Sequence, residues 1–432
     1  MTWTNWARTA SCTPREVLTP GTRTELVDAV GRAVREGRRL RPIGSGHSFT
    51  AVAAAPDVQL DLSRWTGVVS TDLDAKQVTL RSGTRLWQVP GLLAPTGLAM
   101  ANLGDIDRQS IAGAVSTSTH GTGLGFGGLS GQVVGLTLLT GTGDEVRVDA
   151  SDPDLLDAMR VSLGALGVIT EVTLQLVDAF DLHTVERVEP WADVTGLWRR
   201  RVATHDHLEF FWFGHSDEVI TKTTSRHAPG SRPRTPHRPV RGILNDQVLG
   251  NGLFAAVCRL GAWAPRTVPA LNRLTTRAWG AKDVTGASHD VFAHQRRVRF
   301  AEMEYAVGLD DVPAVLGEIR TLFRRDGWAV TFPIEVRASA PDTAWLATNH
   351  ARETGYIAVH QHVSTDYRPL FAAIERIFAA AGGRPHWGKL HTLGAAELSG
   401  LYPRFADFQR LRDTCDPNRV FTNDHLEHVL GR

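Results

Sequence analysis

Two glycine-rich runs constrain this chain more than any other feature. The first spans residues 41–50, RPIGSGHSFT, and the second spans residues 110–123, SIAGAVSTSTHGTG. Gly44 and Gly46 allow backbone N–H groups to approach a ligand closely, which is how a protein cradles a pyrophosphate without a lysine for every charge. The small residues of the second run can lie flat against a large planar ligand while offering hydroxyl and amide groups. Together the runs predict a site for a large ligand with a pyrophosphate and a planar ring.

Two common nucleotide-binding motifs are absent from the sequence. No GxGxxG follows a strand and opens a helix with an acidic residue about 20 positions further on, which is the nicotinamide-dinucleotide pattern. No GxxxxGK[ST] occurs either, so a P-loop is excluded. The ligand is therefore held in another way.

Length and composition limit the class of protein. A chain of 432 residues exceeds the size at which one core keeps growing, so we expect two domains. With 47 basic and 46 acidic residues the net charge is +1, which does not indicate nucleic acid or an anionic membrane as the main partner. Three widely spaced cysteines form neither a disulfide framework nor a CxxC metal site. No apolar leader and no run of 18 apolar residues occurs, so we expect a soluble, cytoplasmic protein without an integral membrane segment.

The pattern up to residue 176 mixes helices with short strands. We expect helices at 21–38, 84–93 and 152–160, strands at 39–44, 58–62, 77–81, 133–140, 144–150 and 161–177, a turn at 71–76 and a hairpin connection at 141–144. From about residue 178 the strands become longer and alternate with amphipathic helices. There we expect strands at 207–214, 299–307, 331–339 and 356–363, and helices at 312–323 and 370–381. This order predicts an antiparallel sheet backed by helices.

One run, residues 226–241, is rich in proline and arginine: RHAPGSRPRTPHRPVR. Its composition predicts a flexible surface loop, and recognition of an anionic partner remains the alternative.

Polar pairs recur on strands that are otherwise apolar. Glu335 and Arg337 lie two apart, so both side chains point to the same face, and His360 and His362 do the same on a later strand. A solvent-facing pair would explain one such strand, but the repetition predicts a polar floor for a polyhydroxylated substrate. Oxidation of a secondary alcohol needs a hydride acceptor, a group that accommodates the hydroxyl proton and a positive charge near the acceptor.

Two other chemistries find little support. The chain has 17 histidines, but no HExxH occurs, and the histidine pair at 360 and 362 has no third ligand at helix spacing, so we expect no catalytic metal. A Ser-His-Asp hydrolase would need a GxSxG elbow between a strand and a helix, and none occurs in that context.

Four motifs in order resemble one family. GSGHS at 44–48, AGAVSTSTHGTG at 112–123, SLGALGVIT at 162–170 and RPHWGK at 384–389 are similar to the sugar-lactone and alditol oxidases of the vanillyl-alcohol-oxidase flavoprotein superfamily, nearly from end to end. The resemblance implies an α+β flavoprotein with a PCMH-type FAD-binding domain at 1–176, an antiparallel-sheet substrate (cap) domain at 177–400, and a C-terminal segment at 401–432 that returns to the FAD domain.

The resemblance also implies roles for particular residues. His47 would carry the FAD covalently through an 8α-histidyl bond. The other cofactor-binding residues would be Pro42, Ile43, Gly44, Ser45, Gly46, Ser48, Ser110, Gly113, Thr117, Ser118, Thr119, His120, Ile169 and His386. The catalytic residues would be Glu335, Arg337, Lys389 and His360, with Asp105 and His362 binding substrate. Alditol oxidases have serine and threonine where Asp105 and His362 stand, which favours the aldonolactone branch.

The resulting hypothesis is an FAD-dependent enzyme that oxidises the C2 hydroxyl of an aldono-1,4-lactone by hydride transfer to flavin N5. The resemblance also implies that the residue at position 104 lies beside the reactive edge of the flavin, where a glycine leaves dioxygen a path and an alanine obstructs it. This chain has Gly104, so we expect an oxidase that forms hydrogen peroxide. An alditol oxidase, a lactone dehydrogenase with another electron acceptor, and a flavin carrier without turnover remain alternatives. The sugar, the physiological electron acceptor and the oligomeric state stay open.

Overall fold

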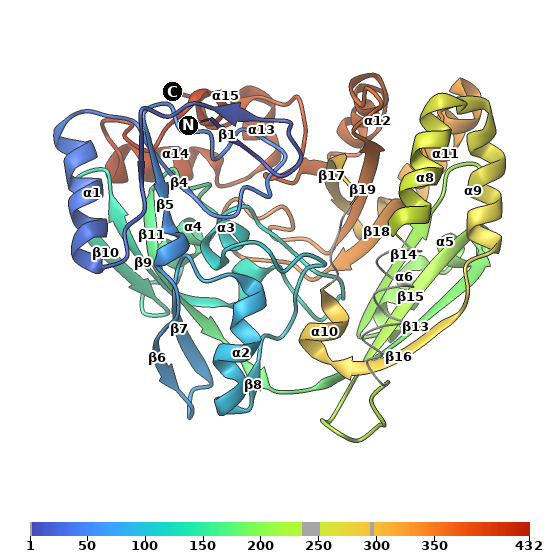
Figure 1. Cartoon of the computed structure of the whole chain (residues 1–432), viewed down its shortest axis with the longest axis horizontal. Helices are drawn as coiled ribbons and strands as arrows, with labels where there is room; N and C mark the ends of the chain where they lie inside the picture. Colours follow the sequence, from blue (N-terminus) through green and yellow to red (C-terminus); the bar gives the residue numbers. More distant parts are fainter. Residues whose placement is uncertain (1, 236–250, 294–297) are drawn as a thin grey trace.

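The computed structural model describes residues 2–235, 251–293 and 298–432, and it has two parts (Figure 1). The first part, blue to cyan, contains several small sheets, and the second contains one large sheet flanked by helices. Both chain termini lie on the first part. This mixture of helices with separate sheets confirms the predicted α+β class.

Two small sheets form the framework of the first part. One is parallel, in the order β3 (Glu16–Leu18), β5 (Val58–Asp61), β4 (Leu40–Ile43). The other is antiparallel, in the order β10 (Glu145–Asp149), β9 (Val133–Thr140), β11 (Gly167–Gln175), β7 (Gln77–Arg81), β6 (Val68–Asp72). Two short pairs are added, β1 (Trp3–Thr4) with β2 (Ser11–Cys12) and β8 (Leu98–Ala99) with β12 (Val177–Asp178). The helices are α1 (Arg23–Arg35), α2 (Val89–Leu93), α3 (Ile111–Ser116) and α4 (Pro153–Arg160).

Helix α1 is fixed by its own sequence. Thr22 caps its start and Glu25 completes a capping box, so two of the exposed backbone donors are bonded. The apolar positions of the helix are buried, and they pack with strands of the parallel sheet. Gly37, just beyond the helix, has φ +61, which favours glycine.

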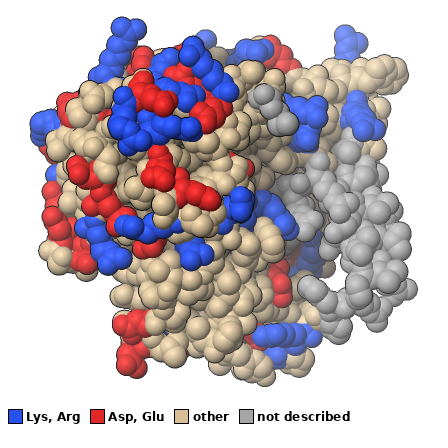
Figure 2. Space-filling model, turned by 60° about the vertical axis from the view of Figure 1, so that its left-hand side comes forward, with Lys and Arg blue, Asp and Glu red and all other residues tan. Residues whose placement is uncertain are grey.

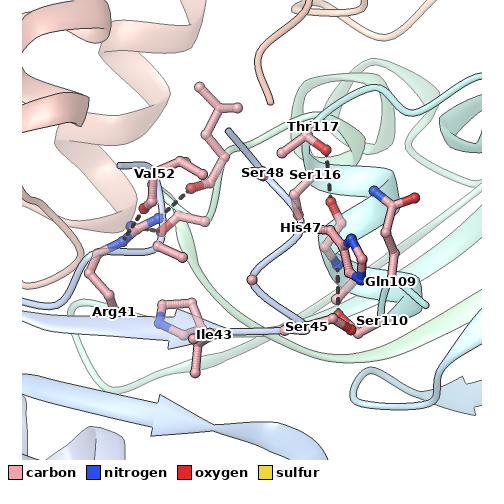
Figure 3. A pocket seen from close by; sticks show the side chains of 18 of the residues that line it. Arg41, Ile43, Ser45, His47, Ser48, Val52, Gln109, Ser110, Ser116 and Thr117 are labelled. Atoms are coloured by element: carbon pink, nitrogen blue, oxygen red, sulfur yellow. Dashed lines mark hydrogen bonds between the residues drawn. The ribbon is translucent and has the colours of Figure 1, made fainter. Parts of the chain in front are cut away.

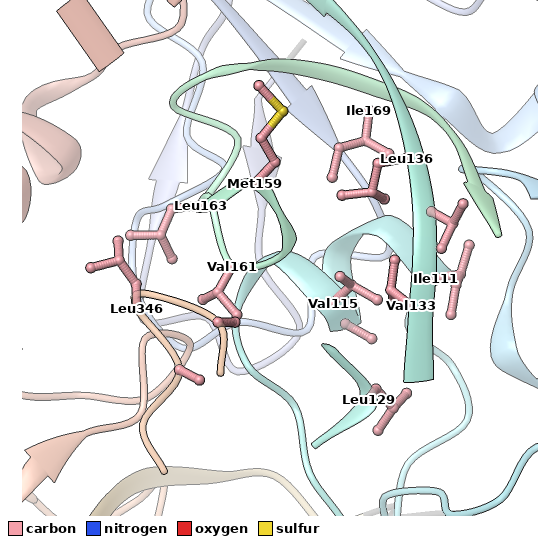
Figure 4. Close-up of a cluster of buried hydrophobic side chains, with 14 of the residues drawn as sticks. Ile111, Val115, Leu129, Val133, Leu136, Met159, Val161, Leu163, Ile169 and Leu346 are labelled. Carbon is pink, nitrogen blue, oxygen red and sulfur yellow. The ribbon is translucent and has the colours of Figure 1, made fainter. Parts of the chain in front are cut away.

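The core of the first part surrounds helix α3 and strand β9 (Figure 4). Ile111 and Val115 of the helix meet Leu129, Val133 and residues from several other elements. Because the second glycine-rich run contains this helix, the apolar packing on one side of the run holds its other side toward a cavity.

Three C-terminal helices return to this core: α13 (Ala395–Leu401), α14 (Phe405–Cys415) and α15 (Asp424–Leu430). Arg41 of β4 ties the C-terminal segment to the rest of the first part. It is 2% exposed and donates hydrogen bonds to the carbonyl oxygens of Val52, Leu163, Gly164 and Phe421. A single guanidinium thus joins the first glycine-rich run, the segment before β11 and the C-terminal segment.

The second part is an eight-stranded sheet in which every neighbouring pair is antiparallel. Its order is β16 (Lys282–Ala287), β13 (Asp181–Pro190), β15 (Glu218–His227), β14 (His207–Trp212), β18 (Ile334–Ser339), β19 (Thr354–His362), β17 (Phe300–Gly308), β20 (Arg384–Pro385). The helices are α5 (Trp191–Gly196), α6 (Trp198–Thr204), α8 (Asn251–Trp263), α9 (Val268–Arg277), α10 (Ser288–Phe292), α11 (Val312–Asp326) and α12 (Arg368–Ala380). Several of these helices contribute to an apolar core against one sheet face, so the other face can carry polar groups.

Three sequence-based predictions differ from the structure. The turn expected at 71–76 begins as strand β6, whose residues are mostly exposed and therefore lack an apolar signal. The helix expected at 84–93 is shorter and starts with a 3₁₀ turn at Leu86–Gln88 before α2. Strands β13, β15 and β16 were not predicted, because their threonine-rich and charged stretches lack a regular apolar alternation.

The surface gives no single sign of charge on the face in Figure 2, where acidic and basic side chains lie intermixed. Among the described residues, no helix is both long and apolar enough to cross a bilayer. Of the proline- and arginine-rich run, residues 236–241 lie outside the described residues. Within its described part, Arg226 stacks on Phe126 and Phe180, and Arg234 bonds Asp181 at 2.7 Å.

Candidate active site

The two glycine-rich runs line one end of a long cavity (Figure 3). Ser45, His47 and Ser48 of the first run lie close to Ser110 and Thr117 of the second on the wall of this space. Residues from the segment before β11 and from β11 itself close the wall. Most side chains around the space are small or apolar, with Arg41, His47 and Gln109 as exceptions, so backbone N–H groups and hydroxyls supply much of its polar character.

Glycine is required where the two runs meet. A Cβ on Gly44 would lie 2.3 Å from the Oγ of Ser110, so any side chain there would force the runs apart. Gly46 has φ +66, and a Cβ on it would also crowd the ring of Trp3. The narrow seam between the runs depends on both glycines.

A second space continues from the first under the large sheet. His47, Ser48, Gln109 and Thr117 line both spaces, so they mark the junction. The second space is walled on one side by the first part of the fold, including Gly104, and on the other by strands β17, β18 and β19. A ligand with a pyrophosphate at one end and a planar ring at the other could extend through both.

His47 stands at this junction as a neutral ring. Burial, helped by the nearby cations Lys389, Arg85 and Arg108, lowers its pKa to about 4. Its ring stacks on Trp6 with centroids 5.8 Å apart and makes no hydrogen bond to any residue that the structure describes. An uncharged imidazole keeps a nitrogen lone pair, which a nucleophile requires.

A row of charged side chains crosses five neighbouring strands of the large sheet. Its members on β17, β18 and β19 line the second space. On β15 and β14, Lys222 bonds Glu209 at 2.8 Å, and Arg337 of β18 donates from Nε to the same carboxylate at 3.0 Å. Arg337 also pairs through Nη2 with Glu335, two residues earlier on its strand. Burial opposes the charge of Glu209, yet Lys222 and Arg337 lower its pKa to about 2. Glu209, Lys222 and Arg337 are therefore held ionised in a buried site.

The row continues on β17 and β19. Glu302 lies opposite His360 in the sheet register; one of its oxygens is 3.5 Å from His360 Nε2 and the other pairs with the ammonium of Lys389. Burial would raise the pKa of Glu302, but Lys389 and His360 lower it to about 2. The ammonium of Lys389 also lies 4.9 Å from the ring centre of Phe49.

Glu304, two residues further on β17, faces two histidines. His120 Nε2 lies 3.4 Å from its carboxylate, and the ligand atoms of His120, Glu304 and His386 all lie within 4.8 Å of one another. Burial lowers the pKa of His386 to about 3, and its Nδ1 accepts a hydrogen bond from the N–H of Gly388 at 3.0 Å. The proton of this neutral ring therefore sits on Nε2, and neither nitrogen has a free lone pair for a metal. The geometry suits a hydrogen-bonding cluster.

Most residues predicted for the site line these two spaces. In the first are Pro42, Ile43, Gly44, Ser45, Gly46, His47, Ser48, Ser110, Gly113, Thr117 and Ile169. In the second are Gly104, Asp105, Thr119, His120, Glu335, Arg337, His360, His386 and Lys389, together with His47, Ser48 and Thr117.

Two predicted residues do not line either space. Ser118 has φ +60, and its hydroxyl turns away to lie 3.4 Å from Thr348 Oγ1. His362 is the last residue of β19, and its ring bonds the hydroxyl of Ser364 in the following turn at 2.6 Å. As predicted from strand parity, His362 lies on the same side as His360, since both rings are near Phe332, but it stands at the end of the strand and does not reach the second space.

Four charged residues of the row were missed by sequence reasoning: Glu209, Lys222, Glu302 and Glu304. Glu302 and Glu304 could have been found, because they repeat the two-residue spacing that singled out Glu335 and Arg337. Glu209 also shows this spacing, since it stands two residues after His207 on β14. Lys222 has no such signal, because it lies in a run of polar residues on β15.

Comparisons with known proteins agree with this geometry. Residues 172–429 match a family model described as D-arabinono-1,4-lactone oxidase, and residues 14–149 match one described as an FAD binding domain. The chain is 39% identical over 429 residues to an L-gulono-1,4-lactone dehydrogenase of Mycobacterium tuberculosis, covering 99% of both chains. It is 32% identical to an alditol oxidase of a Streptomyces species, covering 99% of this chain and 98% of that one, and 29% identical to the L-gulonolactone oxidase of Bos taurus, covering 99% and 97%.

Among solved structures, the fold is similar to cholesterol oxidase from B. sterolicum. The TM-score is 0.77 at 18% identity, and the match covers 99% of this chain and 96% of that one. At this identity the likeness concerns the fold alone.

Proposed function

We propose that this protein oxidises the C2 hydroxyl of an aldono-1,4-lactone of the gulono, galactono or arabinono kind. The chain belongs to the D-arabinono-1,4-lactone oxidase family, and an FAD-binding domain precedes the part that matches this family. The protein is a flavoprotein oxidoreductase of the vanillyl-alcohol-oxidase superfamily. The observation that carries the proposal is the row of paired charges, Glu335 with Arg337 and Lys389 with Glu302, above the end of a cavity that begins at the glycine-rich runs.

The residues around the cavity fit FAD. The seam at Gly44, which a Cβ would fill, gives a diphosphate direct access to backbone groups. Neutral His47 lies between the two spaces and supports a covalent 8α-histidyl bond, which we propose here. When bound, FAD supplies the acceptor for the two electrons and the hydrogen that leave the substrate carbon.

The side chains of the row would do three things for the reaction. The carboxylate of Glu335 would accept hydrogen bonds from hydroxyls of the substrate and so orient it. Arg337 and Lys389 would stabilise the negative charge that develops as the hydroxyl loses its proton. Burial of both pairs, with side chains 18% exposed or less, excludes water and strengthens these interactions.

The polar sheet face suits a substrate with several hydroxyl groups. Oxidation at C2 of such a lactone would give an enediol of the ascorbate type. Asp105, which also lines the cavity, is where alditol oxidases have serine, and this supports the lactone over an open-chain polyol. An alditol remains the second candidate because the chain is 32% identical to an alditol oxidase.

We propose the cytoplasm as the compartment. The three cysteines are free thiols, with Cys258 and Cys415 buried, which suits a reducing environment.

Anaerobic addition of candidate substrates to the FAD-loaded protein tests the proposed activity. We expect an aldono-1,4-lactone to bleach the flavin absorbance at concentrations at which xylitol and sorbitol do not. Bleaching by the polyols alone would favour the alditol oxidase. Absence of bleaching by every sugar would contradict an enzymatic role for the site.

We further propose that dioxygen is the electron acceptor and that Gly104 leaves it a path. A Cβ on Gly104 would lie 3.1 Å from the carbonyl oxygen of His120 and 3.5 Å from a methyl of Thr119, so alanine needs only a small adjustment and would narrow this part of the cavity wall. We expect Gly104→Ala to fold and to react more slowly with oxygen. The measurement is the reoxidation rate after mixing reduced enzyme with aerated buffer. Slow reoxidation of the wild type, unchanged by the alanine, would instead favour a dehydrogenase.

A further inference from the structure

Two histidines of the site are held in the same unusual way. His360 directs Nδ1 at the carbonyl oxygen of Pro333 at 3.1 Å and Nε2 at the carboxylate of Glu302 at 3.5 Å. His120 directs Nδ1 at the carbonyl oxygen of Gly121 at 2.9 Å and Nε2 at the carboxylate of Glu304 at 3.4 Å. Each ring therefore lies between a backbone carbonyl and a glutamate of β17.

A neutral imidazole cannot satisfy these contacts. It carries one proton, so one nitrogen is a donor and the other presents a lone pair. A backbone carbonyl and an ionised carboxylate only accept hydrogen bonds. With one proton, each ring would therefore point a lone pair at an acceptor inside a buried site, whereas with two protons both contacts become hydrogen bonds.

We propose that Glu302 and Glu304 are positioning residues that keep His360 and His120 doubly protonated, so that both rings act in the reaction as fixed positive charges and not as bases. The assignment rests on the proposed function for its role in turnover, but the protonation of the rings does not depend on the substrate.

The charges around the cavity support this assignment. Among the described residues of the row and of the second space, the carboxylates are the buried Glu209, Glu302, Glu304 and Glu335 and the half-buried Asp105, and the permanent cations are Lys222, Arg337 and Lys389. Two imidazolium rings bring the cations to the same number as the carboxylates. Without them the carboxylates would outnumber the cations, and an excess of negative charge is costly in a site of low dielectric.

The other groups that face the two rings agree with positive charge. The ring of Tyr356 stacks on His120, and a cation over an aromatic face is attracted to it. Burial raises the pKa of Tyr356, so the phenol stays neutral. His386, the other titratable group beside His120, is a neutral ring. Around His360 the neighbours are the rings of Phe300 and Phe332, and Lys389, whose ammonium opposes a positive ring but is paired with the other oxygen of Glu302.

The positions of the two glutamates follow from strand geometry. Glu302 and Glu304 are two apart on β17 and so lie on one face, each buried. Burial opposes the charge of Glu304, but His120 and Lys389 lower its pKa well below the usual range. One strand thus supplies a carboxylate to the ring from β19 and to the ring from the second glycine-rich run.

Nitrogen NMR of the FAD-loaded protein with ¹⁵N-labelled histidine tests the proposal. At pH 8 only about one free histidine ring in thirty carries both protons, given an ordinary pKa of about 6.5. We expect two rings, assigned with His120→Asn and His360→Asn, to keep the nearly equal nitrogen shifts of imidazolium at this pH. Widely separated shifts for both rings at pH 8 in the wild type would overturn the proposal, whatever the variants do.

Matched variants identify the carboxylates as the cause. Glu302→Gln is expected to remove the imidazolium signal of His360 at pH 8 and leave that of His120, and Glu304→Gln to do the reverse. Glu209→Gln removes the same charge from the same row, at a carboxylate whose ion-pair partners among the described residues are Lys222 and Arg337, so both signals should remain. Imidazolium signals that persist in both of the first two variants would contradict the role of the glutamates.

The pH dependence of flavin reduction by a lactone gives the functional readout. In Glu302→Gln the rate should fall as the pH rises through roughly 6.5, where a free ring loses its proton, and the wild type should lack this step. The same fall in the wild type would contradict the proposal. If no lactone reduces the flavin at all, the proposed function fails while the NMR result still decides the protonation of the rings.

Discussion

Replacing Lys389 by alanine is expected to slow reduction of the bound flavin by a lactone about a hundred- to a thousandfold. The ammonium of Lys389 lies beside Phe49, near the junction of the two spaces. Removal of one preorganised charge partner typically costs about 2.7–4 kcal/mol of transition-state stabilisation. Folding should change little, because Glu302 keeps its contact with His360. Anaerobic stopped-flow spectroscopy gives the rate, and thermal unfolding gives the stability.

Two further variants compare loss of a positive charge at the site with loss of a positive charge elsewhere on the protein. Arg337→Ala should slow the same step but also lower the melting temperature, since Glu209 and Glu335 would remain buried without their shared partner. Lys282→Ala removes an exposed lysine of edge strand β16, paired with Glu186, and should leave the rate unchanged. A wild-type rate of reduction in Lys389→Ala would reject the assigned site.

Replacing His47 by alanine is expected to abolish retention of FAD by the denatured protein. In the wild type, the covalent bond should keep yellow colour and in-gel fluorescence on the chain after acid precipitation. The variant should still bind FAD reversibly, because the glycine seam and the second run do not depend on the imidazole ring. The flavin absorbance of pellet and supernatant measures the outcome.

A histidine elsewhere on the cavity wall provides the control. His386→Asn changes another buried ring of the second space but should leave FAD in the pellet. Wild-type protein that releases all its FAD on acid precipitation would disprove the covalent bond, while leaving the FAD site itself in place.

The parts of the site that the sequence predicts are those built from local patterns. The glycine seam depends on residues within two short runs, and the Glu335–Arg337 pair depends only on the alternation of one strand. The contact of Glu209 with Arg337 escapes prediction because it joins residues 128 apart and arises only where β14 and β18 are neighbours in the sheet. The same limit explains His362, since alternation says which face a residue takes but not where its strand ends.

The proposed protonation of the histidines depends on the order and register of the strands. His360 and Glu302 are opposite one another only because β19 pairs with β17 in one register. Shifting that register by one residue would turn the carboxylate to the apolar core. The chemistry of the ring is thus set by a pairing that no single stretch of sequence encodes.

Arg41 carries a consequence for how the protein is made. Its hydrogen bond to Phe421 closes a loop of 380 residues, and the buried Val420 and Phe421 complete the core beneath the first glycine-rich run. During synthesis, strand β4 emerges long before Val420 and Phe421 exist. The guanidinium of Arg41 therefore lacks its hydrogen bond to Phe421 until the strands of the large sheet have been translated. Assembly of the FAD cradle therefore follows translation of the last helices, and a fragment ending before them would expose an incomplete core to aggregation.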